Sequence, residues 1–382
     1  MQEISMQVRK IAVAACLGLG LLMVSAPAQA QYHLTNLVSN QLDAHAPTVD
    51  PLLANPWGLA RSSGSPWWLS DNDTGWSTLY NAAGTEESLK VVVPTAGNGP
   101  VEATGGNGPG TPTGIVFNGS KTDFQVSGAS SSFIFATLDG TISAWPGTNK
   151  NLATLVYPTS TNPAPSTANP PSYTGLAITS NASGNYLYAA DNANNQIDMF
   201  DGSFNLVKSF GDPAVPSTLS VFGVQDIGGW VYVTYAVPNV GAGGYVDIFK
   251  EDGTFVKTLI QSDRLNQAWG IALAPSNFGP LSNTLLVSNN SVDGTINGFD
   301  PMTGKFVGTI RDERGRKIIL NNLWGIAFGG GTTSNGATNE LFVTVGQGIG
   351  TNELAGTFAS IVFNPTPGFN PTLDYDNEDH PK

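Results

Sequence analysis

The 382-residue chain has very little histidine and almost no cysteine. His33, His45 and His380 are its only histidines, and all three lie outside the repeats described below, which excludes a His-based triad or a multi-histidine metal site within them. Its single cysteine, Cys16, lies in a segment that we expect to be cleaved off. The mature chain would then have no disulfide, thiol nucleophile or thiolate metal site.

Charged residues are also scarce, and positive charge is the scarcer sign. They make up 12% of the chain, against about 25% in typical domains. Lys and Arg number 16 against 29 Asp and Glu, for a net charge of −13. This balance argues against nucleic acid and anionic membranes as partners, because both require basic surface. The chain has no Gly-x-Ser-x-Gly elbow, no P-loop and no Gly-x-Gly-x-x-Gly after a strand.

Residues 1–30 have the pattern of an export signal. Arg9 and Lys10 precede an apolar stretch over 11–24, and Ala28-Gln-Ala30 supplies the small residues of a cleavage site. A rival interpretation, a lipoprotein site with lipid on Cys16, has too little apolar chain before the cysteine. The segment is too short for stable membrane insertion, so we expect a protein secreted to the periplasm or the extracellular space.

A short phrase, a Gly followed by alternating apolar and small residues, occurs six times. Its glycines stand at positions 58, 114, 175, 223, 270 and 325, so the spacing runs from 47 to 61 residues. Each phrase precedes further short runs rich in β-branched and aromatic residues and bounded by turn formers, which indicate strands. Four strands per repeat and six repeats predict an all-β, six-bladed β-propeller over residues 31–363.

The two ends of the repeat region predict how the ring closes. The last repeat lacks a fourth strand, because the run over 356–363 is followed by Asn-Pro-Thr-Pro-Gly. A strand pattern without a repeat of its own, residues 32–38, stands before the first phrase. We expect it to join the outer edge of the last blade and so remove an open sheet edge. Residues 364–382 are expected to be an acidic, disordered tail.

The phrases Pro56-Trp-Gly-Leu-Ala60 and Tyr188-Ala-Ala-Asp-Asn-Ala-Asn-Asn-Gln-Ile-Asp-Met-Phe200 resemble NHL repeats. Over nearly its whole mature length the chain resembles an uncharacterised family of exported bacterial six-bladed propellers. Resemblance to NHL proteins implies binding of a ligand or partner on one propeller face. Six-bladed lactonases share the architecture and hold a divalent metal in the channel with Glu, Asn and Asp, but this chain has no evident channel Glu.

Aromatic residues gather just before the repeat glycines, where the channel mouth is expected. Trp57, Phe222, Trp269 and Trp324 hold this position in four repeats, and Thr113 and Thr174 in the other two. Asn55 and Asn322 stand two residues before their tryptophans. Such a mouth would suit a neutral polar ligand, by stacking and hydrogen bonds. In the alternative interpretation, each Trp packs between blades and each Asn closes a turn.

Acidic and amide side chains also recur at matching strand ends. The candidates are Asp71, Asp73, Asp191 and Asn289. Their oxygens are ligands that Ca²⁺ accepts, although the bidentate Glu of a calcium loop is missing. The alternative is that each makes a turn with its own backbone.

The sequence therefore favours a binding module that takes a small neutral ligand, a glycan or a protein through one loop-rich face. Long segments over 94–113 and 158–173 precede the second and third phrases on that face. The alternative is a metal-assisted hydrolase of lactones or sugars that uses the Asp and Asn set. A third is a structural protein of the envelope.

Overall fold

The structure is a computed structural model and describes residues 32–95, 110–148, 150–164, 169–181, 184–237, 241–346 and 355–364. The export signal predicted at 1–30 and the predicted tail, apart from Asn364, lie outside these ranges. No helix in the part of the chain that the structure describes is long and apolar enough to cross a bilayer.

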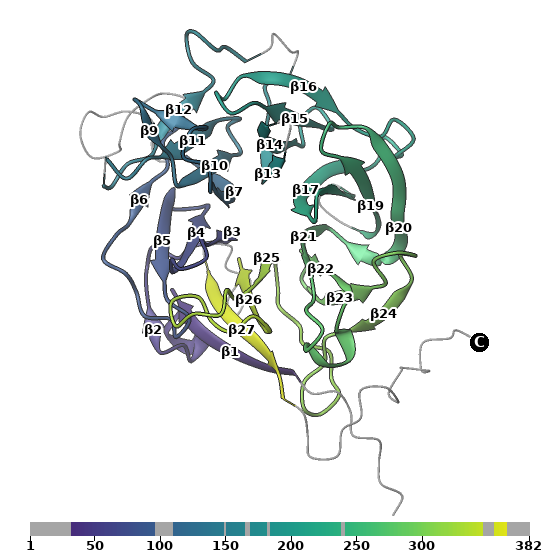
Figure 1. Cartoon of the computed structure of the whole chain (residues 1–382). Coiled ribbons are helices and arrows are strands. Elements are labelled where there is room, and N and C mark those ends of the chain that lie inside the picture. The colour runs from purple at the N-terminus through teal and green to yellow at the C-terminus, as the bar shows by residue number, and fades with distance from the viewer. Residues whose placement is uncertain are drawn as a thin grey trace, which may run out of the picture.

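Six antiparallel sheets stand around a central axis, and each places its first strand innermost (Figure 1). Blade 1 consists of β3 (Pro56–Ala60), β4 (Trp67–Asp71), β5 (Trp76–Tyr80) and β6 (Val91–Val92). Blade 2 consists of β7 (Pro112–Phe117), β10 (Phe133–Thr137), β11 (Ile142–Trp145) and β12 (Thr154–Tyr157). Blade 3 consists of β13 (Tyr173–Asn181), β14 (Gly184–Asp191), β15 (Gln196–Phe200) and β16 (Leu206–Phe210).

The remaining blades complete the predicted ring. Blade 4 consists of β17 (Ser220–Ile227), β18 (Trp230–Ala236), β19 (Ala242–Lys250) and β20 (Phe255–Asn266). Blade 5 consists of β21 (Ala268–Leu273), β22 (Leu285–Asn289), β23 (Ile296–Phe299) and β24 (Phe306–Thr309). Blade 6 consists of β25 (Leu323–Phe328), β26 (Glu340–Val345), β27 (Thr357–Phe363) and β1 (Tyr32–Ser39). The six-bladed, four-stranded architecture predicted from the repeats is confirmed.

The few other elements lie in the connections and at the edge of the closing blade. A small hairpin, β8 (Gln125–Val126) with β9 (Ala129–Ser130), lies between the first two strands of blade 2. Two short 3₁₀ helices are η1 (Leu42–Ala44) and η2 (Gly279–Leu281). The strand β2 (Thr48–Val49) pairs in parallel with β1.

The N-terminal strand closes the ring, as the sequence predicts. β1 runs antiparallel to β27 in a register that begins with Tyr32 opposite Phe363 and ends with Ser39 opposite Thr357. Figure 1 shows the purple first strand beside the yellow last one. The edge that β27 would otherwise expose is therefore paired by the start of the same chain.

The repeat glycines are explained by the close approach of the innermost strands. In each blade the register between the first two strands shifts near this glycine. A Cβ on Gly223 would lie 2.1 Å from the Trp269 carbonyl oxygen, and one on Gly114 would lie 2.2 Å from the Leu176 nitrogen. Only glycine lets neighbouring backbones come this close at the axis.

Buried hydroxyl groups join neighbouring blades at the same level. Thr344, on the second strand of blade 6, accepts the Gly325 N–H at 2.8 Å and donates to the Trp57 carbonyl of blade 1 at 2.6 Å. Ser288 makes the same pair of bonds with Gly270 and with the Trp324 carbonyl. Each bridge satisfies a backbone N–H and a carbonyl that the shift in register removes from the ladder.

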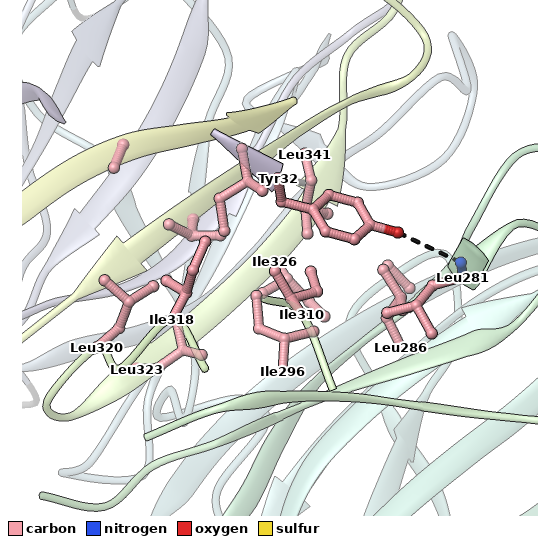
Figure 2. Close-up of a cluster of buried hydrophobic side chains, with 14 of the residues drawn as sticks. Tyr32, Leu281, Leu286, Ile296, Ile310, Ile318, Leu320, Leu323, Ile326 and Leu341 are labelled. Atoms are coloured by element: carbon pink, nitrogen blue, oxygen red, sulfur yellow. Dashed lines mark hydrogen bonds between the residues drawn. The ribbon is translucent and has the colours of Figure 1, made fainter. Parts of the chain in front are cut away.

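Most of the apolar core lies between blades. Figure 2 shows the cluster between blades 5 and 6, in which Ile296 and Ile310 of blade 5 face Ile326 and Leu341 of blade 6. Tyr32 of the closing strand reaches into it, and its hydroxyl donates to the Phe278 carbonyl and accepts the Leu281 N–H. Each blade is therefore stabilised mainly by its neighbours.

Candidate functional site

The four aromatic side chains predicted at the channel mouth lie together and contact one another. Trp57, Phe222, Trp269 and Trp324 come from blades 1, 4, 5 and 6, and form what we call the aromatic cluster. The rings of Trp57 and Trp324 stack with centroids 3.6 Å apart, and the ring of Trp269 meets both edge-on. The three indoles are only 6–9% exposed, so the aromatic cluster closes the channel where the innermost strands begin. We call this side the upper face.

Polar atoms of neighbouring blades hold the cluster in place. The Trp269 indole N–H donates to the Thr174 carbonyl at 2.8 Å, and that of Trp324 donates to the Asn55 side-chain oxygen at 3.1 Å. The indole N–H of Trp57 is buried and has no hydrogen-bond partner among the described residues. The faces of the indoles are occupied by one another rather than exposed to a ligand.

The two predicted amide residues stand in the turns that lead into the innermost strands. Asn55 and Asn322 have φ of +47° and +52°, in the left-handed region that Asn tolerates better than most residues. Gln267 has the matching conformation in blade 5. In addition to its turn, Asn55 links blade 1 to blade 6 through Trp324. These are the contacts of residues that position the aromatic cluster.

The four residues proposed for calcium make hydrogen bonds close to their own strands. Asp71 is fully buried and accepts the Thr78 N–H, and burial raises its pKa well above the usual value, which favours the neutral acid. Asp191 accepts N–H groups of Ser172 and Asn194. Within the described ranges, no three His, Cys, Asp or Glu side chains lie close enough to hold a metal ion.

Of the remaining two calcium candidates, Asp73 bonds within blade 1, whereas Asn289 of blade 5 bonds to β20 of blade 4. Asp73 accepts a bond from the Asn55 amide, and Asn289 accepts the Asn266 N–H and donates to the Arg264 carbonyl. Calcium binding stays a prediction, and a titration with Ca²⁺ after treatment with EDTA would test it.

A cavity of about 470 Å³ lies on the axis, on the other side of the aromatic cluster. Its lining starts at the level of Trp269 and the repeat glycines, and it includes the innermost strand of every blade. It extends to the ends of these strands, where Leu273 is 46% exposed at the rim and marks the lower face. The lining combines aliphatic residues such as Leu176, Val224 and Ile326 with a similar amount of polar surface. We call it the axial cavity.

Sequence reasoning did not identify the residues at the lower end of the axial cavity. Arg61 and Gln225 are the polar side chains there, and Arg61 is the only charged residue among the described residues of the lining. Arg61 follows the repeat glycine Gly58 by three positions, where four of the other repeats have Phe117, Ile178, Leu273 and Phe328. Its occurrence in a single repeat is the signal that could have indicated it.

The fold and the axial cavity define a six-bladed β-propeller with an axial ligand-sized chamber. No family model matches the chain. It is 32% identical over 312 residues to an uncharacterised protein of Acanthamoeba polyphaga mimivirus, covering 78% of this chain and 73% of the relative. The chain belongs to the same family as this viral protein. A second uncharacterised mimivirus protein is 34% identical over 215 residues, 52% of this chain and 38% of the relative's length.

Solved structures give the same architecture at low sequence identity. The PQQ-bound aldose sugar dehydrogenase of Streptomyces coelicolor matches 88% of this chain and 99% of its own, with a TM-score of 0.52 and 12% identity. Virginiamycin B lyase of Staphylococcus aureus matches 87% of this chain and 99% of its own, with a TM-score of 0.50 and 12% identity. At this identity the likeness is one of fold alone.

Proposed function

We propose that the protein is a binding module whose ligand occupies the axial cavity from the lower face. The observation that carries this proposal is a chamber of about 470 Å³ to which all six blades contribute and which the aromatic cluster closes at one end. Its volume lies within the roughly 300–1,000 Å³ that is typical of small-molecule sites. The export predicted from residues 1–30 would make it a secreted binding protein.

This proposal places the ligand on the opposite side of the aromatic cluster from the loop-rich face that the sequence favours. The reason is that the indoles of Trp57 and Trp324 stack on each other and, with Trp269, are only 6–9% exposed. Among the described residues, no Asp or Glu lines the axial cavity. We therefore favour binding over metal-assisted hydrolysis, which needs groups that hold the metal or transfer protons.

The test compares two Trp substitutions in blade 5. Leu273→Trp enlarges a side chain at the exposed rim of the axial cavity, whereas Val292→Trp enlarges one that is 66% exposed in the loop after β22, on the upper face. Both positions are exposed, so neither substitution should disturb the core. Calorimetric titration with decanol, an uncharged molecule with an apolar chain, measures the binding.

We expect decanol to bind the unmodified protein and Val292→Trp alike, and Leu273→Trp at least about tenfold more weakly. Unchanged binding by Leu273→Trp would place any bound decanol outside the axial cavity. Failure of decanol and of its charged analogues to bind the unmodified protein would overturn the proposed function.

A further inference from the structure

Arg61 lies at the lower end of the axial cavity and is held there by main-chain oxygens. Its Nε and Nη2 donate to the Phe328 carbonyl of blade 6 at 3.0 and 2.8 Å. Its Nη1 donates to the Ser62 carbonyl at 3.3 Å, and its guanidinium carbon lies 5.4 Å from the centre of the Trp67 ring. These contacts fix the position of the guanidinium without neutralising its charge.

The positive charge of Arg61 has no carboxylate partner among the described residues. The ion pairs there involve other cations, namely His33, Lys90 and Arg316. In blade 4 the position that corresponds to Arg61, three residues after the repeat glycine, is Asp226. The charge that acts on the Asp226 carboxyl is that of Glu251. Burial lowers the pKa of Arg61, which is the cost of holding a cation partly out of water.

The guanidinium keeps hydrogen-bonding capacity for a ligand. Of its five N–H groups, three donate to the carbonyls of Phe328 and Ser62, which leaves one on each of Nη1 and Nη2. Paired terminal N–H groups fit the two oxygens of a carboxylate. Gln225, exposed on blade 4, adds an amide to the same lining.

We propose that the axial cavity selects amphipathic anions, with an aliphatic chain against lining residues such as Ile178 and Leu273 and a carboxylate head on Arg61. The inference rests on the proposed function and adds the sign of the ligand's charge. A preference for anions is the opposite of what the net charge of −13 predicts, because that charge would attract cations to the protein as a whole. A preference for anions would therefore be a property of this chamber rather than of the whole surface.

The test compares three molecules that share a ten-carbon chain, by calorimetry at neutral pH. Decanoate carries a negative charge, decanol none, and decylamine a positive one. We expect the unmodified protein to bind decanoate about tenfold more tightly than decanol, and decylamine most weakly. Equal binding of decanoate and decanol, or tightest binding of decylamine, overturns the inference while leaving the proposed function intact.

Substitution of the arginine assigns the preference to its side chain. Arg61→Met should remove the difference between decanoate and decanol. Arg264→Met is the matched control, because Arg264 also lies over an aromatic ring, that of Phe306 at 4.0 Å, but does not line the axial cavity. Decanoate preference that persists in Arg61→Met would overturn the assignment. If Arg61→Met does not fold, the three-molecule comparison on the unmodified protein still decides the charge preference.

Discussion

Asp247 is a buried carboxyl group that ties stability to pH. It lies on β19 with no exposed surface, and neither of its oxygens has a hydrogen-bond partner among the described residues. Burial, with the nearby Asp212 carboxyl, raises its pKa from 3.8 to about 7. Since the folded-state pKa lies above the unfolded one, the fold favours the protonated form. Its contribution is complete below about pH 4 and is lost as the pH rises through about 7.

We predict that Asp247→Asn stabilises the protein more at pH 8 than at pH 5. The amide cannot ionise, so the charge that forms in the unmodified protein at high pH is absent. A gain of about 2 °C in melting temperature at pH 8 is expected for about 1 kcal/mol in a chain of this size. Asp263→Asn, an exposed site, is the control. The same change at both pH values would show that ionisation of Asp247 is not the cause.

Gly223 gives a second prediction for a single residue. Gly223→Ala would put a methyl group 2.1 Å from the Trp269 carbonyl oxygen, so two innermost strands must move apart. We expect a loss of about 1–3 kcal/mol or more, measured by denaturant unfolding. Gly64→Ala is the matched control, because nothing lies within 4 Å of its added methyl. Similar losses for both variants would mean that backbone flexibility, not close approach, explains the repeat glycine.

At the scale of elements, the Tyr32 hydroxyl is one of the contacts that join β1 to blade 5. The Tyr32 hydroxyl donates to the Phe278 carbonyl and accepts the Leu281 N–H, and Figure 2 shows the second of these bonds. We predict that Tyr32→Phe lowers stability by about 1–3 kcal/mol in thermal unfolding, because both backbone groups stay buried and unpaired. Tyr245→Phe should have little effect, since that hydroxyl makes no hydrogen bond with the described residues. Equal effects would mean that the Tyr32 hydroxyl contributes nothing particular.

The strands could be predicted from the sequence because they repeat, whereas the site could not. In five of the six phrases the glycine marks a close approach between neighbouring blades, and residues 32–38 stand out because the last repeat lacks a strand. The direction in which Trp57 and Trp324 point depends on the diameter of the channel, which no single repeat encodes. Arg61 was not predicted from the repeats because, among the described residues that line the axial cavity, it is the only cation.

At the scale of the whole molecule, ring closure protects the edge of β27. We predict that deletion of residues 1–39 lowers the melting temperature and causes self-association, because the bared strand would present unpaired N–H and carbonyl groups. Size-exclusion chromatography with light scattering measures the association. Deletion of residues 1–30 alone is the control and should leave the protein as it is. A stable monomer without residues 1–39 would show that three strands suffice for blade 6.

The pairing of Tyr32 with Phe363 also determines when the ring can close during synthesis of the chain. A ribosome that adds 5–20 residues per second needs on the order of half a minute between these two positions. During that interval the first strand has emerged and its partner does not yet exist. While it is unpaired, this segment must not pair with other strands. The first strand to be synthesised is therefore the last to pair, and blades 1 to 5 can form before it.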